Sequence, residues 1–390
     1  NIQQASPAGY SSHTHNRGDY NDIAEQQVNQ NVDVVFGGGK QYLVPKSQGG
    51  ARTDNENLID VLKARGYGFV ENREQLLASK DKKVWGMFAA DAMAYEMDRP
   101  LLQPQEPSLA EMTQKAIEIL SKNKKGFFLF VEGSKVDWAS HANDPIGVIS
   151  DVIAFDNAIK AALDFAKKDG NTLVLAFSDH GNGGMSLGNK GTEKNYDTLP
   201  YEALVEPLHK ANLTGEGVEK VLGEDRSEAH IREVMEKHFG IANLTADEIV
   251  AIQKAKKGAM NYAVGPMMSK RSIIGWTTSG HTGEDLPLYA YGPNAPKGTV
   301  DHAEITQITA RALGIELGST TKRLFVEAET ALTAVGAKVM IDQTDKANPR
   351  LVAVKGNVRA ELPFSTNLIT IDKETKQLEG LTVFSAKTGK

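Results

Sequence analysis

The sequence predicts an α/β protein built on a doubly wound, mostly parallel sheet with helices on both faces. Short apolar runs rich in aromatic and β-branched residues, such as residues 127–131, are typical of strands buried on both faces of a parallel sheet. These runs alternate along the chain with amphipathic helical stretches, as parallel sheets require. Two segments depart from the alternation, which indicates a helical insertion at 199–262 and a small β-rich appendage at 321–390.

Turn and capping residues divide the main domain into elements. Asp54 is expected to cap a helix, and Ser108 with Glu111 forms a capping box before the next one. Asp144 and Pro145 mark the N-cap and first position of a third. The expected strands are residues 32–36, 67–70, 84–88, 127–131, 172–177 and 288–291. The expected helices are residues 54–66, 108–120, 144–170 and 301–313.

The insertion and the appendage have different patterns. The insertion carries a second capping box at Thr245 and Glu248, and its place over the carboxyl edge of the sheet suits a lid or an oligomer contact. The alternative is that the insertion is a solvent-exposed group of helices without a functional role. The appendage alternates apolar and polar residues between turn residues, and its expected strands are 338–341, 351–354, 368–371 and 381–384. The expected main domain is therefore 1–320.

Composition limits the function classes. The chain has 390 residues and a formal net charge of −6, without a basic cluster, which argues against a nucleic-acid partner. No apolar run approaches the roughly 20 residues needed to cross a bilayer. Cysteine is absent, so disulfides and thiolate metal sites are excluded. Any metal must be held by His, Asp, Glu or hydroxyl groups.

Potential ligands follow the strand expected at 127–131. Glu132 stands at its carboxyl end, where ligands gather in open α/β sheets. Asp137 and His141 are four residues apart, so they share one face of a helical turn and can present one carboxylate oxygen and one imidazole nitrogen to a single cation. The alternative is that Glu132 is a surface acid, Asp137 a helix cap and His141 a solvated side chain.

Two further segments repeat this chemistry. Asp179 and His180 follow the strand expected at 172–177, and His281 lies within Ser-Gly-His-Thr-Gly before the strand expected at 288–291. The repetition favours a metal site over isolated surface residues. The appendage has no such group of residues.

Four segments in order resemble the alkaline phosphatase family over about residues 1–315. They are residues 5–8 (Ala-Ser-Pro-Ala), 131–141 (beginning Val-Glu-Gly), 178–180 (Ser-Asp-His) and 279–283 (Ser-Gly-His-Thr-Gly). The resemblance implies an alkaline phosphatase-like fold and a metal-dependent phosphomonoesterase with two zinc ions and one magnesium ion.

The resemblance also implies ligands for these ions. Asp137, His141 and His281 would hold one zinc, and Asp179 and His180 would belong to the second. The neighbouring magnesium would take Glu132 and the hydroxyl of Ser6. Two cations about 4 Å apart serve both ends of an in-line displacement at phosphorus.

Arg17, eleven residues after Ser6, stands at the separation at which the family carries its phosphate-binding arginine. Its fork would grip two phosphate oxygens. Trp138 stands where some relatives carry Lys or His, and Gln4 where they carry Asp or His. Both differences remove charge near the phosphate site, and one hypothesis is weaker phosphate binding with faster product release.

The nucleophile of the family is not found in this chain. The resemblance implies a phosphoserine intermediate formed on the serine of an Asp-Ser-Ala or similar segment, yet none of the serines follows an Asp. The N-terminal strands that carry it are therefore expected to be absent. Three explanations compete: a cleaved N-terminal segment that is still bound, a sequence incomplete at its amino end, and a degenerate relative.

The expected substrates are small phosphate monoesters, and the resemblance implies a homodimer that is periplasmic or secreted. Related phosphodiesterases, sulfatases and phosphomutases share the metal core, but Arg17 and residues 279–283 favour monoesters. A metal- or phosphate-binding fragment without turnover is the non-enzymatic alternative.

Overall fold

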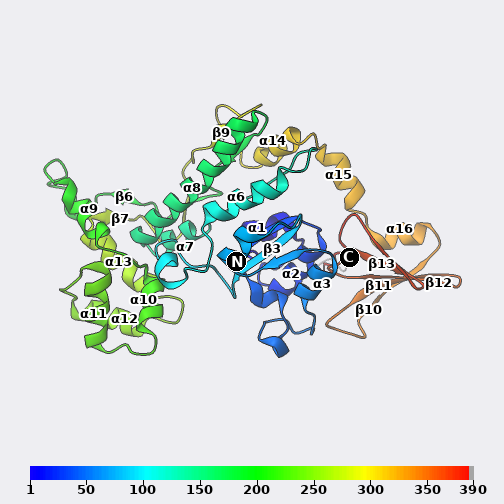
Figure 1. The fold of residues 1–390 in the computed structure, drawn as a ribbon, viewed down its shortest axis with the longest axis horizontal. Helices are drawn as coiled ribbons and strands as arrows, with labels where there is room; N and C mark the ends of the chain where they lie inside the picture. Colours follow the sequence, from blue (N-terminus) through cyan, green and yellow to red (C-terminus); the bar gives the residue numbers. More distant parts are fainter. Residues whose placement is uncertain (386–390) are drawn as a thin grey trace. The chain divides into compact units, whose positions relative to one another are not determined.

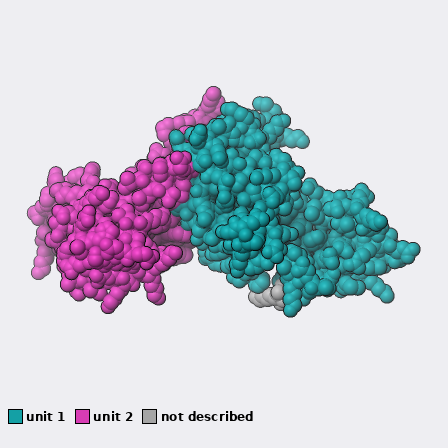
Figure 2. Space-filling model, turned by 60° about the horizontal axis from the view of Figure 1, so that its bottom comes forward, with its two compact units in different colours: residues 1–93, 115–130, 298–390 teal, residues 94–114, 131–297 magenta. Residues whose placement is uncertain are grey.

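The computed structural model describes residues 1–385. The chain forms two compact units, which Figure 1 shows as ribbons and Figure 2 in different colours. Unit 1 comprises residues 1–93, 115–130 and 298–390, and unit 2 comprises residues 94–114 and 131–297. No helix among the described residues is both long and apolar enough to cross a membrane.

Unit 1 contains a parallel three-stranded sheet in the order β1-β3-β2. Its strands are β1 (Val34–Gly38), β2 (Gly68–Val70) and β3 (Val84–Ala89), and both outer strands pair parallel with the central one, with a register shift between Gly37 and Gly38 of β1. Five of the six residues of β3 are buried, as expected for a central strand of a parallel sheet. The strands expected near 32–36, 67–70 and 84–88 are confirmed.

Short helices accompany this sheet: α1 (Ala5–Ser11), α2 (Tyr20–Asn29), α3 (Leu58–Ala64) and α4 (Arg73–Ala78). The prediction that Asp54 caps α3 is wrong. Asn57 is the N-cap, because its side chain accepts hydrogen bonds from the backbone N–H groups of Ile59 and Asp60. Asp54 instead accepts from the Arg52 guanidinium and from the Glu56 N–H.

The carboxyl-terminal part of unit 1 is an antiparallel meander in the order β10-β11-β12-β13-β14. The strands are β10 (Lys338–Asp342), β11 (Arg350–Lys355), β12 (Val358–Pro363), β13 (Leu368–Ile371) and β14 (Glu374–Gln377). Leu351, Ala353 and Leu362 form its core, against which α16 (Ala328–Ala334) packs through Leu332. The β-rich appendage is confirmed, although residues 381–384 form no strand. Helices α14 (Glu304–Ala312) and α15 (Leu317–Leu324) precede it.

Unit 2 is mainly helical. Helix α8 (Pro145–Asp169) begins where expected: Asp144 accepts a hydrogen bond from the Ile146 N–H, and Gly170 ends the helix with a φ of 76°. The insertion is helical as expected, and its capping box at Thr245 and Glu248 is present. The other helices are α5 (Arg99–Leu102), α7 (Lys135–His141), α9 (Tyr201–His209), α10 (Gly215–Leu222), α11 (Glu228–Phe239), α12 (Ala246–Lys254) and α13 (Asn261–Arg271). Helix α6 (Leu109–Leu120), with the expected Ser108 and Glu111 box, runs from unit 2 into unit 1.

The strands of unit 2 form antiparallel pairs, which are β4 (Val174–Ala176) with β9 (Tyr289–Tyr291), β5 (Gly181–Asn182) with β8 (His281–Thr282), and β6 (Ser186–Leu187) with β7 (Ile274–Gly275). The prediction of a doubly buried strand at 127–131 is wrong. That segment forms no strand, and Phe128 is 47% exposed. An apolar run supplies the side chains for a buried strand, but neighbouring strands must supply the hydrogen bonds. The α/β class, with a parallel sheet, helices and antiparallel carboxyl-terminal strands, is nevertheless confirmed.

Candidate metal centre

Helix α7 brings the first two predicted ligands together. Asp137 and His141 lie one turn apart, and Asp137 Oδ1 is 3.5 Å from His141 Nε2. Between them, Ala139 is fully buried, so this helix has one face fixed against the rest of unit 2. The helical spacing read from the sequence therefore places a carboxylate and an imidazole side by side.

His281 reaches the same point from the short strand β8. In the ladder with β5, His281 is paired with Asn182. One ligand atom each from Asp137, His141 and His281 lies within 4.8 Å of the others. These three residues were predicted to share one cation, and the structure brings them together. Their role as ligands stays a prediction.

A glycine turn allows this approach. Gly183, directly after β5, has a φ of 76°, and its N–H donates to the Gly280 carbonyl at 2.9 Å. A Cβ at Gly183 would lie 2.7 Å from the Trp276 ring. Both the backbone conformation and the close approach favour glycine here. The turn thereby holds the segment that carries His281 next to β5.

The orientation of His141 is set by a carbonyl group. His141 Nδ1 lies 2.7 Å from the backbone oxygen of Ser279, so this nitrogen carries the hydrogen and donates it. Nε2 then lies on the side of Asp137. Histidines that bind metals are usually fixed in this way by a bond from the other ring nitrogen.

Asp179 and His180 adjoin this cluster. The His180 ring stacks on the His281 ring with centroids 3.6 Å apart and an interplanar angle of 17°. His180 Nε2 is 3.4 Å from Asp179 Oδ2, while the Ser178 hydroxyl donates to the His180 carbonyl at 2.7 Å. The pair predicted for the second cation thus lies beside the ligands predicted for the first.

Asn182 is a residue of this centre that the sequence analysis missed. Its Nδ2 donates to Asp137 Oδ1 at 2.6 Å and to the Asp137 carbonyl at 3.1 Å. One carboxylate oxygen of Asp137 is thereby held by an amide. The available signal was its position two residues after His180, a spacing that puts both side chains on one side of an extended segment.

Lys135 was also missed. Its side chain is buried, and its ammonium lies 2.8 Å from Glu216 in α10, 4.2 Å from the Tyr95 ring centre and 4.4 Å from the Trp138 ring centre. Burial raises the pKa of Glu216, but Lys135 and then Lys220 outweigh it, so that the net pKa is below its ordinary value. Helix α7 is thus tied to the insertion by an ion pair.

A buried carboxyl group lies directly behind α7. Asp144, the N-cap of α8, is 1% exposed, and burial raises its pKa to about 7 despite the hydrogen bonds from the Gly147 and Ile146 backbone. Its N–H donates to the Ala139 carbonyl of α7 at 2.9 Å. This bond joins the ligand-bearing helix to α8.

The remaining predicted site residues are distributed over both units. Glu132 lies in unit 2, in the irregular segment before α7, and Trp138 is 36% exposed. Ser6, Arg17 and Gln4 belong to unit 1, with Ser6 in α1 and Gln4 as its N-cap. The roles of these residues at the metal and phosphate site stay predictions.

The donor set suits zinc. Imidazole nitrogen and carboxylate oxygen are ligands that zinc accepts, and three protein ligands leave a coordination position for substrate or water, as catalytic zinc sites do. The hydrogen bonds from His141 to the Ser279 carbonyl and from Asn182 to Asp137 supply the surrounding shell such sites need.

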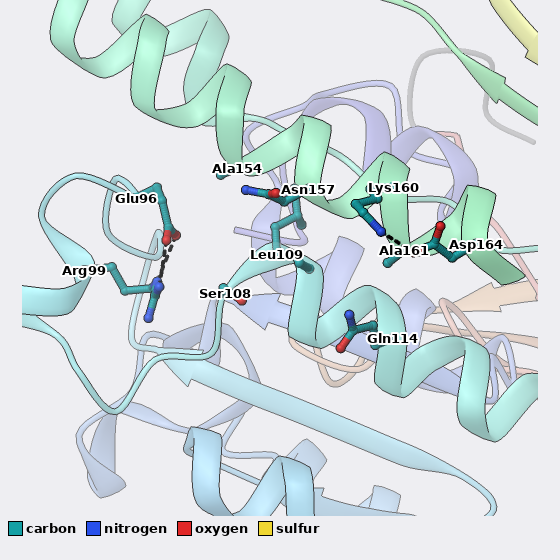
Figure 3. A pocket seen from close by; sticks show the side chains of 11 residues that line it. Glu96, Arg99, Ser108, Leu109, Gln114, Ala154, Asn157, Lys160, Ala161 and Asp164 are labelled. Atoms are coloured by element: carbon teal, nitrogen blue, oxygen red, sulfur yellow. Dashed lines mark hydrogen bonds and ion pairs between the residues drawn. The ribbon is translucent and has the colours of Figure 1, made fainter.

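A separate cavity of about 310 Å³ lies in unit 2 (Figure 3). Helices α6 and α8 and the segment around α5 line it. Its charged residues neutralise one another, because Arg99 donates to Glu96 at 2.7 Å and Lys160 pairs with Asp164. None of the residues lining it is a histidine, so the cavity is distinct from the metal centre.

Comparisons with known proteins show which proteins this chain is similar to. The family model described as alkaline phosphatase matches residues 1–315. Alkaline phosphatase 3 of Bacillus subtilis (strain 168) is 37% identical over 326 residues, which are 80% of this chain and 66% of the relative. The chain thus spans slightly less than two thirds of that relative.

Solved structures are similar as well. The alkaline phosphatase of Thermus thermophilus matches with a TM-score of 0.71 and 27% identity, over 81% of this chain and 69% of that one. A variant of the alkaline phosphatase of the Antarctic bacterium TAB5 matches with a TM-score of 0.51 and 26% identity, over 81% and 70%. That variant has magnesium bound in a site called M3. The alkaline phosphatase-like fold expected from the sequence is therefore confirmed.

Proposed function

Because the chain belongs to the alkaline phosphatase family, we propose that it acts in the hydrolysis of phosphate monoesters to an alcohol and inorganic phosphate. The observation that carries the proposal is the convergence of Asp137, His141 and His281, whose ligand atoms lie within 4.8 Å of one another. The resemblance to the family implies that these three residues bind one cation.

The proposed site holds two zinc ions and one magnesium ion. Asp137, His141 and His281 would bind the first zinc, and Asp179 with His180 would belong to the second. Glu132 and Ser6 would contribute to magnesium. Bound there, the metals would neutralise charge on the phosphoryl oxygens and lower the pKa of an oxygen nucleophile.

The protein side chains orient the proposed metal ligands and bind the phosphate group. His141 is fixed by the Ser279 carbonyl, and Asn182 holds Asp137 in place by a hydrogen bond. Arg17 would bind two phosphate oxygens, since its planar fork matches their spacing. Trp138 is neutral and partly exposed on α7, which fits the hypothesis that product phosphate is held weakly and leaves quickly.

The proposed mechanism includes a covalent phosphoserine intermediate. One observation about its serine nucleophile leaves a second function possible. None of the serines of this chain follows an aspartate. The second candidate is therefore a metal- and phosphate-binding chain that does not turn over substrate on its own. Phosphodiester or sulfate ester hydrolysis is a weaker alternative within the superfamily. We also propose that the protein is a homodimer in the periplasm or outside the cell.

Hydrolysis of p-nitrophenyl phosphate at alkaline pH tests the proposal. Turnover that a chelator removes and zinc with magnesium restores is the expected result. His141→Ala should abolish it, while His209→Ala, at an exposed position of α9, should not.

The outcomes separate the candidates. Zinc binding without turnover would support the second candidate, whereas turnover that resists both the chelator and His141→Ala would refute a metal centre at this place. Parallel assays with bis-p-nitrophenyl phosphate and p-nitrophenyl sulfate distinguish the other ester classes. Intact mass of the active sample shows whether a further segment accompanies the chain.

A further inference from the structure

The five-stranded sheet of unit 1 has two unlike edges. One edge strand, β14, has the sequence Glu-Thr-Lys-Gln and is exposed throughout. The other, β10, carries Val339, Met340 and Ile341 at its centre, and Met340 and Ile341 are 55% and 39% exposed. Within residues 1–385, β10 pairs with β11 only. Natural edge strands are normally protected by charged residues, as β14 is and the centre of β10 is not.

The two faces of β10 differ. Val339 packs against the core residues Leu351 and Ala353, as does Leu332 of α16, so α16 lies on the face of the sheet to which Val339 points (Figure 1). Side chains alternate along a strand, and Ile341 therefore shares the face of Val339. The opposite face carries Lys338, Met340 and Asp342, with Asp342 bound to Arg350 of β11 at 3.1 Å.

We propose that β10 pairs antiparallel with β10 of a second copy of this chain, with Met340 on the two-fold axis. The free N–H and C=O groups of each edge would then bond to one another, and the two sheets would become continuous. This surface lies in the appendage, and the family resemblance does not supply it. Because a five-residue strand makes a small interface, the association should depend on protein concentration.

Charge and face together fix the register. When the two-fold axis is perpendicular to the sheet, α16 of both copies lies on the same face of the joined sheet. Two residues that oppose each other across the axis must therefore have side chains on one face. Centring on Met340 opposes Lys338 to Asp342 and Val339 to Ile341. In this register each charged residue opposes a residue of opposite charge, and each apolar residue opposes an apolar one.

Neighbouring registers lose this match. Centring on Val339 opposes Lys338 to Met340, and centring on Ile341 opposes Met340 to Asp342. Each leaves a charge opposite a thioether and shortens the paired segment. Opposite charges across strands stabilise pairing, while an unmatched charge does not.

The absence of cysteine makes a direct test available. In the proposed pair, the Cβ atoms of the two residues at 340 are about 4.5–5.5 Å apart, so Met340→Cys should be crosslinked into a dimer by a short bifunctional maleimide. Thr375→Cys, at an exposed position of the β14 edge, is the matched control and should stay uncrosslinked. Equal crosslinking of both variants, or none of Met340→Cys, would overturn the proposal.

A mixture of variants tests the register. Lys338→Cys and Asp342→Cys should crosslink to each other when mixed and much less when each is alone. The opposite pattern would exclude the register centred on Met340.

Sedimentation of the full chain tests whether the charge pair matters. Lys338→Glu places Glu opposite Asp342 and should remove this association step, halving the mass observed at high concentration. Lys373→Glu, with the same charge change in the exposed turn before β14, should leave the mass unchanged. An unchanged mass for Lys338→Glu, with thermal unfolding like that of the wild type, would show that the chain associates elsewhere or not at all.

Discussion

Two regions of the molecule gather three potential metal ligands each, and they differ in what balances the charge. The groups are Asp137, His141 and His281 in unit 2, and Glu25, Asp54 and Glu56 in unit 1. In each group the ligand atoms lie within 4.8 Å of one another. Proximity of potential ligands therefore does not by itself distinguish a metal centre.

The unit 1 group already contains a cation. The Arg52 side chain is fully buried and pairs with Asp54, with Glu25 at 3.4 Å and with Glu56 at 3.9 Å. It also donates to the Asn21 carbonyl at 2.8 Å. A guanidinium thus lies among the three acids and pairs with each of them. In unit 2 the Asp137 carboxylate instead lies beside the His141 imidazole and accepts a hydrogen bond from the Asn182 amide.

Replacing Arg52 by Met should have the largest effect, which is a loss in the free energy of unfolding. Removing one partner of a buried ion pair costs about 3–5 kcal/mol, because the remaining charges stay buried without compensation. Urea unfolding should show that loss in the free energy of unfolding. Arg232→Met is the control, since the exposed pair of Arg232 with Glu228 should contribute less than about 1 kcal/mol.

Calcium extends the same experiment. If Arg52 occupies the place of a cation, calcium should raise the melting temperature of Arg52→Met and leave that of the wild type unchanged. A variant as stable as the wild type would show that the acids do not depend on Arg52.

His281→Ala should affect metal binding next most. Structural zinc sites bind with about 10–16 kcal/mol, so one of about four ligands accounts for roughly 3 kcal/mol, or about 100-fold in affinity. Competition with a chromogenic chelator measures this change. His209→Ala should retain the affinity of the wild type, and an equal loss in both variants would place the metal elsewhere.

Glu25 gives the unit 1 group a pH dependence. Burial, and after it the nearby Glu56 carboxyl group, raise the pKa of Glu25 to about 8, although Arg52 lowers it. The folded state therefore keeps a proton that the unfolded chain releases near its ordinary value. The stability from this proton is complete at low pH and is lost as pH rises toward 8.

Glu25→Gln should remove this dependence. Between about pH 6 and pH 7.5 the wild type should lose about 2 kcal/mol that the variant keeps, at about 1.4 kcal/mol per pH unit for one proton. Urea unfolding at a series of pH values measures the difference. A constant difference across the series would mean that Glu25 is ionised in the folded state throughout.

Asn182→Ala should have the smallest effect. Loss of a hydrogen bond to a metal ligand typically reduces metal affinity by about 10-fold, near the lower end of the range for such residues. The chelator competition used for His281 applies here. Asn171→Ala, at an exposed position after α8, is the control, and an unchanged affinity for Asn182→Ala would show that Asp137 needs no such support.

Local signals in the sequence determined several features. The capping box at Thr245 and Glu248, the Asp144 cap and the Asp137 to His141 spacing depend on residues within four positions of each other. Such hydrogen bonds and helical spacings form wherever the backbone turns locally, so a pattern in the sequence is sufficient to predict them.

Other features were decided only by the tertiary structure. Asn182 reaches Asp137 over 45 positions, and the Ser279 carbonyl reaches His141 over 138. The segment at 127–131 has a strand's composition but forms no strand, and Asp54 binds Arg52 rather than capping α3. The sequence alone determined which side chains have metal-binding chemistry. Their convergence, and the presence of an internal cation in one acid group, depend on packing between distant segments, because hydrogen bonds and ion pairs form only where folding brings donors, acceptors and charges together.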